Sequence, residues 1–264
     1  MRTRTIVVAL LTVSTAAPVA AQRTHDQARL SLGLAIGGTV GRSLWSVTNQ
    51  PINDGLLTDT LSLERDIRAG LAVVFHGTYF PSDHWGFTGE AMLIGLGFED
   101  QCRQLTSSLS SDNAAVCNSI RGHDSPGSAV GLSVGALYRV WSRKVVSPYA
   151  RAHAGFIISQ HSSLELNGFI PISSVDQSEF RVYVDNGKHG ITPVLGLGVG
   201  FTAALGPGYQ LRWEFRDNLV GLQRVIGPTS ANFQEPPSKR SYQHVLSMTF
   251  GFDIVLERKR GRRY

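Results

Sequence analysis

The sequence predicts an all-β protein, an eight-stranded antiparallel up-and-down transmembrane β-barrel. Three observations predict this fold class. Eight segments alternate large apolar residues with small or polar ones, their connections are alternately long and short, and the chain begins like an exported protein. Alternation with a period of two is typical of a β-strand, because successive side chains point to opposite faces. No segment keeps the 3.6-residue period of a helix.

The eight predicted strands share this two-sided pattern, and in chain order they are 29–41, 69–80, 86–98, 130–141, 149–159, 195–203, 209–216 and 244–254. One face of each carries leucine, valine, isoleucine or an aromatic residue. The other face is mostly Gly, Ser, Ala and Thr, with isolated charges and almost no lysine. A water-exposed face usually carries abundant Lys and Glu. The pattern therefore predicts a barrel with its apolar side chains outside and its small or polar side chains in a narrow lumen.

The connections support an up-and-down order. After the first, third, fifth and seventh strands they are long and rich in Ser, Asn, Asp, Gly and Pro, at about 43–66, 100–126, 162–188 and 221–240. The other three are short, at 81–86, 142–148 and 206–208. Long loops at one end and tight turns at the other are typical of consecutive antiparallel hairpins.

The N-terminus predicts export. Residues 1–22 combine a basic start (Arg2, Arg4), a short apolar run and small residues before Gln22, which is the pattern of a cleaved signal peptide. We expect the barrel and its loops to occupy 23–256 and a basic periplasmic tail to occupy 257–264. The net charge of +5 resides in the signal and the tail, so the region between them is close to neutral. Nucleic acid is not an expected partner, because that region has no basic face.

Aromatic residues gather near the short connections. Bilayer-spanning barrels carry such residues as a girdle at the membrane–water interface. The predicted girdle consists of Tyr79, Trp85, Tyr138, Trp141, Tyr149, Tyr209 and Trp213.

With these features the chain resembles the small eight-stranded bacterial outer-membrane barrels of Gram-negative bacteria, the class of the OmpA transmembrane domain and OmpX, over about residues 27–256. The resemblance implies an outer-membrane location, long loops outside the cell, and turns and termini in the periplasm. It implies outer-membrane lipid and the barrel assembly machinery as partners. Members commonly end on an aromatic residue that this machinery reads. Here either Phe250 and Phe252 or the terminal Tyr264 would serve.

The inward set predicts a polar network in the lumen. Its members are Glu90, Arg139, Arg151, His153, Arg212, Glu214, Arg216 and Asp253. An isolated charge in a narrow lumen must be paired, since burying one alone costs on the order of several kcal/mol. We therefore expect a mostly closed lumen and a structural or surface-interaction role. The alternative is a narrow porin-like channel for small solutes, although eight strands leave room for little beyond side chains.

A second alternative is a lipid A-modifying hydrolase. His161, Ser163 and Glu165 would share a face if the fifth strand continued that far, and a serine nucleophile needs a nearby base and an orienting acid. These three residues are similar to the Ser/His/acid site of the lipid A deacylases. No oxyanion donor is evident, so we expect no enzymatic activity.

The two cysteines, Cys102 and Cys117, lie in the second long connection and predict one disulfide in an exported protein. No metal is expected, because two thiols without nearby histidines fall short of four ligands. No cofactor is expected either, since the glycine-rich segment 196–206 does not open a helix. The basic tail either contacts anionic lipid headgroups or is a solvated end, and no extracellular ligand is indicated.

Overall fold

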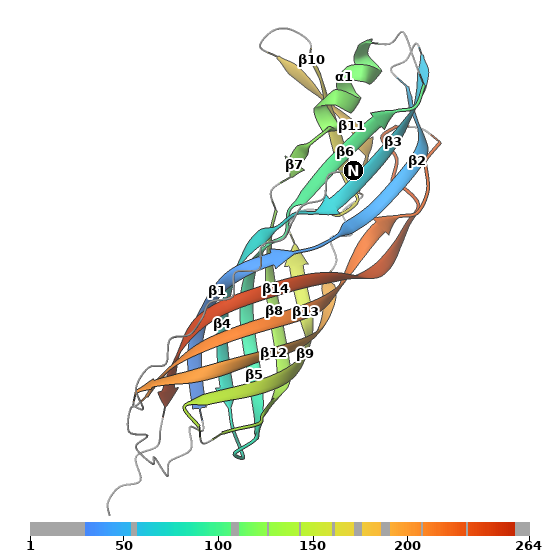
Figure 1. Cartoon of the computed structure of the whole chain (residues 1–264). Coiled ribbons are helices and arrows are strands. Elements are labelled where there is room, and N and C mark those ends of the chain that lie inside the picture. The colour runs from blue at the N-terminus through green and yellow to red at the C-terminus, as the bar shows by residue number, and fades with distance from the viewer. Residues whose placement is uncertain are drawn as a thin grey trace, which may run out of the picture.

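The computed structural model describes residues 30–53, 57–106, 111–125, 127–142, 144–159, 162–171, 176–185, 191–206, 208–230 and 232–256. The predicted signal peptide and basic tail, including Tyr264, lie outside the described residues. Two parts stack along one axis, a barrel and a smaller assembly of strands and one helix above it (Figure 1).

Eight strands close the barrel, in the order β1-β14-β13-β12-β9-β8-β5-β4, with every neighbouring pair antiparallel. They are β1 (Leu30–Val40), β4 (Gly70–Tyr79), β5 (Trp85–Gly95), β8 (Ser128–Arg139), β9 (Val146–Ser159), β12 (Thr192–Gly206), β13 (Tyr209–Val225) and β14 (Ser238–Leu256). The first and last strands pair from Leu30–Leu256 to Val40–Leu246, so the cylinder has no open seam at this level. The predicted fold class and strand order are confirmed.

The barrel is apolar outside and polar inside. On β12, Leu195, Leu197 and Val199 are exposed, whereas the intervening positions face the lumen. On β13, Phe215 is exposed, and its neighbours Glu214 and Arg216 are buried. This inverted polarity follows from the period of two, since a shift of one residue would reverse every side chain. Among the residues described, no helix is long and apolar enough to cross a membrane.

The long connections are largely strands, which differs from the loops expected of them. They contain β2 (Ser43–Asn53), β3 (Thr58–Ile67), β6 (Phe98–Gln104), α1 (Ser111–Ile120), β7 (His123–Ser125), β10 (Leu166–Pro171) and β11 (Gln177–Tyr183). Their sheets have the orders β2-β3-β6-β7 and β10-β11. The fourth connection is shorter than predicted, because β13 and β14 extend beyond the barrel as a hairpin. We call these elements and the tip of that hairpin the loop domain.

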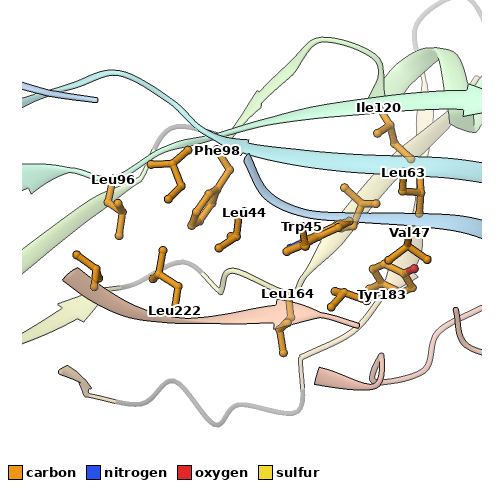
Figure 2. Packing of buried hydrophobic residues seen from close by; sticks show 14 of the residues in the cluster. Leu44, Trp45, Val47, Leu63, Leu96, Phe98, Ile120, Leu164, Tyr183 and Leu222 are labelled. Carbon is orange, nitrogen blue, oxygen red and sulfur yellow. The ribbon is translucent and has the colours of Figure 1, made fainter. Parts of the chain in front are cut away.

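The loop domain has a hydrophobic core that continues into the upper barrel. Figure 2 shows Trp45 of β2 packed beside Val47, Leu63 and Tyr183, with Phe98 and Leu96 nearer the barrel. The rings of Trp45 and Tyr183 meet edge to face with centroids 6.0 Å apart. Because β2 and β3 belong to the first connection, β6 to the second and β11 to the third, the core joins three connections into one unit above the barrel.

Candidate functional site: the lumen and the loop domain

Four charged side chains cross the middle of the lumen. Glu90 from β5 accepts hydrogen bonds from Arg151 Nη1 of β9 at 2.5 Å and from Arg216 Nη1 and Nη2 of β13 at 2.8 and 3.0 Å. Glu214, also on β13, accepts a hydrogen bond from Arg216 Nε and lies 3.3 Å from Arg151 Nη1. All four are buried, and we call them the lumen cluster. Two carboxylates facing two guanidinium groups leave no net charge.

The register of β12 makes room for the lumen cluster. Gly198 pairs with Arg151 on one side and with Arg216 on the other. A Cβ at Gly198 would lie 3.1 Å from Arg151 Cγ and 3.1 Å from Glu214 Oε1. A larger residue there would require these side chains to move by a few tenths of an ångström.

A second polar layer lies nearer the short turns, at the end we call the turn end. Asp253 of β14 contacts His76 Nε2 at 2.8 Å and accepts a hydrogen bond from Gln210 Nε2 at 2.9 Å. Arg212 Nε lies 3.8 Å from the same carboxylate, and its guanidinium group stacks over Tyr149 with 5.3 Å to the ring centroid. Tyr149 donates its hydroxyl hydrogen to Glu214 Oε2 at 2.5 Å, which joins this layer to the lumen cluster.

Two members of the predicted network lie apart from the carboxylates. Arg139 stacks over Phe80 at 3.4 Å from the ring centroid, beside the first short turn. His153 Nε2 contacts Asn218 Oδ1 at 3.1 Å above the lumen cluster. All eight predicted network residues are therefore buried in the lumen, but they form layers rather than one network.

Sequence reasoning missed four members of these layers, His76, Tyr149, Gln210 and Asn218. Tyr149, Gln210 and Asn218 have the parity of Arg151, Arg212 and Arg216, so the period of two places them on the inward face. Gln210 was left out because it is uncharged, and Asn218 because it lies beyond the predicted end of its strand at residue 216. His76 was left out although it alternates with the outward apolar residues of β4.

The structure corrects the prediction that Tyr149 belongs to the girdle. Tyr149 is buried in the lumen because it lies two residues before Arg151, and alternate residues of a strand share a face. The structure places Tyr79, Trp85, Tyr138, Trp141 and Tyr209 on the outer surface at the turn end, each at least two-fifths exposed. Trp213 is half-buried and lies on the outward face of its strand. Its ring stacks on that of Phe201, with the ring centroids 5.5 Å apart.

Side chains fill the lumen at three levels. Phe80, Leu137 and Tyr149 form an apolar cluster at the turn end, the lumen cluster fills the middle, and the core of the loop domain covers the top. Between the lumen cluster and that core lies a cavity of about 20 Å³, lined largely by apolar residues such as Val74, Ile157 and Val220. A cavity of this size holds about one water molecule, so it provides no path for a solute.

A buried ion pair organises the loop domain. Arg65 of β3 binds Asp100 of β6 with both branches of its guanidinium group, Nε–Oδ1 at 2.6 Å and Nη2–Oδ2 at 2.8 Å. The guanidinium lies between the rings of Trp45 and Phe98, at 5.4 and 5.2 Å from their centroids. Trp45 Nε1 in turn donates to the carbonyl oxygen of Ser163 at 3.0 Å, which ties the third connection to the first two.

A second polar contact ties the fourth connection to this unit. The buried side chain of Gln50 accepts hydrogen bonds at Oε1 from the Tyr183 hydroxyl at 3.0 Å and from the Thr229 amide at 2.9 Å. Burial raises the pKa of the Tyr183 phenol, so this hydroxyl stays protonated as a donor. All four long connections are therefore joined through buried hydrogen bonds.

The described part of the chain does not place the hydrolase candidates on a continuation of the fifth barrel strand. β9 ends at Ser159, and His161 lies outside the described residues. Ser163 Oγ donates a hydrogen bond to the carbonyl oxygen of Gln223 at 2.8 Å. Glu165 accepts one from Asn167 at 3.3 Å. Ser163 and Glu165 thus hold the third connection in place, and neither is set beside a base in the described part of the chain.

The disulfide between Cys102 of β6 and Cys117 of α1 is present, and it fastens the helix to the sheet of the loop domain. No group of three or more His, Cys, Asp or Glu residues within the described ranges is arranged to hold a metal ion.

Replacing both cysteines with serine is expected to destabilise the loop domain by about 3 kcal/mol, because the bond closes a loop of 15 residues in the unfolded chain. Hydrogen exchange of the α1 amides would measure this loss. The exchange rates of the barrel strands should not change. Unchanged protection of α1 in the double variant would contradict the stabilising role of the disulfide.

The strand pairing and the inverted polarity define the class of this protein, an eight-stranded transmembrane β-barrel. No family model matches the sequence, and no curated protein matches it. Solved structures of similar shape include Neisserial surface protein A, at 10% identity over 86% of this chain and 96% of that one, with a TM-score of 0.43. They include the outer membrane protein OprG of Pseudomonas aeruginosa, at 12% identity over 88% and 98%, with a TM-score of 0.46. They also include Ail, the attachment invasion locus protein of Yersinia pestis, at 13% identity over 86% and 98%, with a TM-score of 0.34. The class assignment rests on the strands and their polarity, not on these distant likenesses.

Proposed function

We propose that this protein is an outer-membrane barrel that holds its loop domain at the cell surface as a structural or interaction platform. The observation that carries the proposal is the belt of exposed apolar side chains around the barrel, which includes Leu34, Phe75, Leu93, Leu197 and Phe250. In water such a belt would drive aggregation. In a bilayer it faces lipid, while closure of the barrel pairs the backbone groups of the strands.

Three features support a platform rather than a channel. The lumen is filled by paired charges, and the cavity above them is too small for a solute other than water. The loop domain is built around its own hydrophobic core, which is more than a set of barrel connections requires. It also presents two small sheets and a helix beyond the barrel (Figure 1).

The orientation follows from the aromatic residues and from the length of the connections. Most of the exposed tyrosine and tryptophan side chains lie at the turn end, where Lys144 also stacks on Trp141 with 4.5 Å to the ring centroid. We place this end at the periplasmic interface, with the phospholipid leaflet as its lipid partner. The outward rings of Phe250 and Phe252 on β14 are then available to the barrel assembly machinery during insertion. The loop domain, at the opposite end, faces the outside of the cell.

Cysteine labelling in intact cells tests both location and orientation. A membrane-impermeant maleimide should label Arg103→Cys on β6, because this exposed position lies in the loop domain. It should label Lys144→Cys, exposed at the turn end, only after the outer membrane has been permeabilised. Equal labelling of both variants in intact cells, or of neither, would refute the proposal.

The purified protein should give no stepwise conductance in a planar bilayer, because the ion pairs and the apolar clusters close the lumen. Reproducible single-channel steps would instead support the narrow porin-like channel. They would contradict the proposal that the protein serves only as a platform.

A further inference from the structure

The hairpin of β13 and β14 continues well beyond the barrel wall. The pairing of β14 with β1 ends at Leu246, yet its pairing with β13 continues to Ser238. Over Ser238–Val245, β14 is therefore bonded to β13 alone and has an open edge. We call 220–225 and 238–245 the hairpin extension. It forms one flank of the loop domain, beside β2 (Figure 1).

The outward face of β14 changes its chemistry along this extension. Ile254, Phe252, Phe250 and Met248 form part of the apolar belt. The following outward residues are Leu246, His244, Tyr242 and Arg240, of which Tyr242 is about half exposed. An apolar surface thus gives way to an imidazole, a phenol and a guanidinium group on one continuous strand.

The height of this change matches a membrane boundary. A strand rises about 3.4 Å per residue, and barrel strands tilt by about 40°. The ten residues from Ile254 to His244 then climb about 26 Å, close to the apolar band of about 25 Å that such barrels present to lipid. His244 is therefore at the upper edge of the hydrocarbon, and Tyr242 and Arg240 lie about 5 and 10 Å above it.

The tip of the extension is basic and lacks carboxylate partners. Arg224 pairs directly with Lys239, and Arg240 is adjacent to Lys239 in sequence. Like charges directly opposite in a sheet repel each other. Within the described ranges, no carboxylate forms an ion pair with any of the three. At the boundary, Asp217 Oδ2 lies 2.8 Å from His244 Nδ1.

We propose that the hairpin extension binds the phosphorylated sugar headgroup of an outer-leaflet glycolipid. Arg240 contacts phosphate, Tyr242 on the same outward face packs on the sugar, and Lys239 on the opposite face adds positive charge to the exposed tip. Phosphate supplies the negative charge that the basic tip lacks, and guanidinium groups bind it through paired N–H donors. A phenol with one apolar and one polar end suits the interface between acyl chains and sugars. This inference rests on the proposed outer-membrane location, because it requires the extension to stand above the outer leaflet.

The test compares lipid binding by wild-type protein and by Lys239→Gln/Arg240→Gln in a neutral detergent, measured by native mass spectrometry. The probes are bis-phosphorylated lipid A, the same lipid A without phosphates, and phosphatidylglycerol. Each cation near an anionic lipid surface contributes about 1 kcal/mol, so the double variant should bind bis-phosphorylated lipid A about 30-fold more weakly. Its binding of dephosphorylated lipid A should not change.

Arg103→Gln is the matched control, because Arg103 is an exposed arginine on the loop-domain sheet. It should bind all three lipids like wild type. The inference is overturned if the double variant keeps wild-type affinity for bis-phosphorylated lipid A. It is equally overturned if phosphatidylglycerol binds wild type as tightly as that lipid does, since the attraction would then be to any anionic lipid.

Insertion of the wild-type protein into phosphatidylcholine vesicles distinguishes failure of the glycolipid-binding inference from failure of the proposed outer-membrane function. If the wild type does not insert, the outer-membrane proposal and this inference both fall. If it inserts but shows no preference for phosphorylated lipid A, only the inference falls.

Discussion

Glu90→Gln is expected to lower the free energy of unfolding of the barrel by about 3–5 kcal/mol, because it removes one partner of a buried charge network and leaves the other partners uncompensated. Glu90 is buried and accepts hydrogen bonds from both Arg151 and Arg216. Glutamine keeps the volume but not the charge, so the lumen would hold an excess positive charge in a space that excludes water. Urea titration of the protein folded in lipid vesicles, followed by tryptophan fluorescence, measures the change.

The matched control is Glu179→Gln. Glu179 is also paired with an arginine, Arg181, but both side chains are about half exposed and 3.8 Å apart. Its replacement should change the free energy of unfolding by less than about 0.5 kcal/mol. The double variant Glu90→Gln/Arg216→Gln should recover part of the loss, since it removes charges of both signs. A loss below about 1 kcal/mol for Glu90→Gln would contradict the role of the lumen cluster, because breaking a buried pair costs more than this.

Asp100→Asn is expected to unfold the loop domain locally while the barrel stays folded. Arg65 would keep its charge between Trp45 and Phe98 without a counter-ion, at a cost of about 3–5 kcal/mol. Because the barrel strands do not include this pair, their stability should hardly change. Trypsin cleavage of the vesicle-bound protein would report the effect. We expect cleavage within the loop domain to rise at least tenfold, with the barrel fragment still protected.

Asp124→Asn provides the comparison for Asp100→Asn. Asp124 belongs to the neighbouring strand and pairs with Arg68, but both side chains are nearly half exposed. Water can solvate Arg68 when its partner is lost, so trypsin sensitivity should remain that of wild type. If Asp100→Asn proved as resistant as Asp124→Asn, the buried ion pair would not hold the loop domain together.

The barrel could be predicted from the sequence because its signal is local and repeated. Each barrel strand alternates with a period of two, and each is followed by a recognisable connection. The loop domain could not be predicted in this way. Its core residues come from three connections and from the β13–β14 hairpin, and Trp45, Phe98, Leu164 and Tyr183 are far apart in the sequence. No short segment contains enough of them to show that a core exists.

In the lumen, too, one part of the arrangement could be predicted from the sequence and another part could not. Strand parity predicted that Glu90, Arg151, Glu214 and Arg216 face inward, but it could not pair them. Which groups meet depends on the register between strands, as in the alignment of Gly198 with Arg151 and Arg216. The assignment of Tyr149 to the girdle was wrong because closeness to a turn was given more weight than parity.

Nitroxide scanning along β14 in lipid vesicles tests the inverted polarity most directly. Single labels at Ser247, Met248, Thr249 and Phe250 would be compared for collision with oxygen, which partitions into lipid, and with a water-soluble nickel complex. We predict high oxygen accessibility at Met248 and Phe250, low accessibility to both reagents at Ser247 and Thr249, and low nickel accessibility at all four. Strong collision of the Met248 and Phe250 labels with the nickel complex would place the apolar face in water and contradict the membrane-spanning barrel.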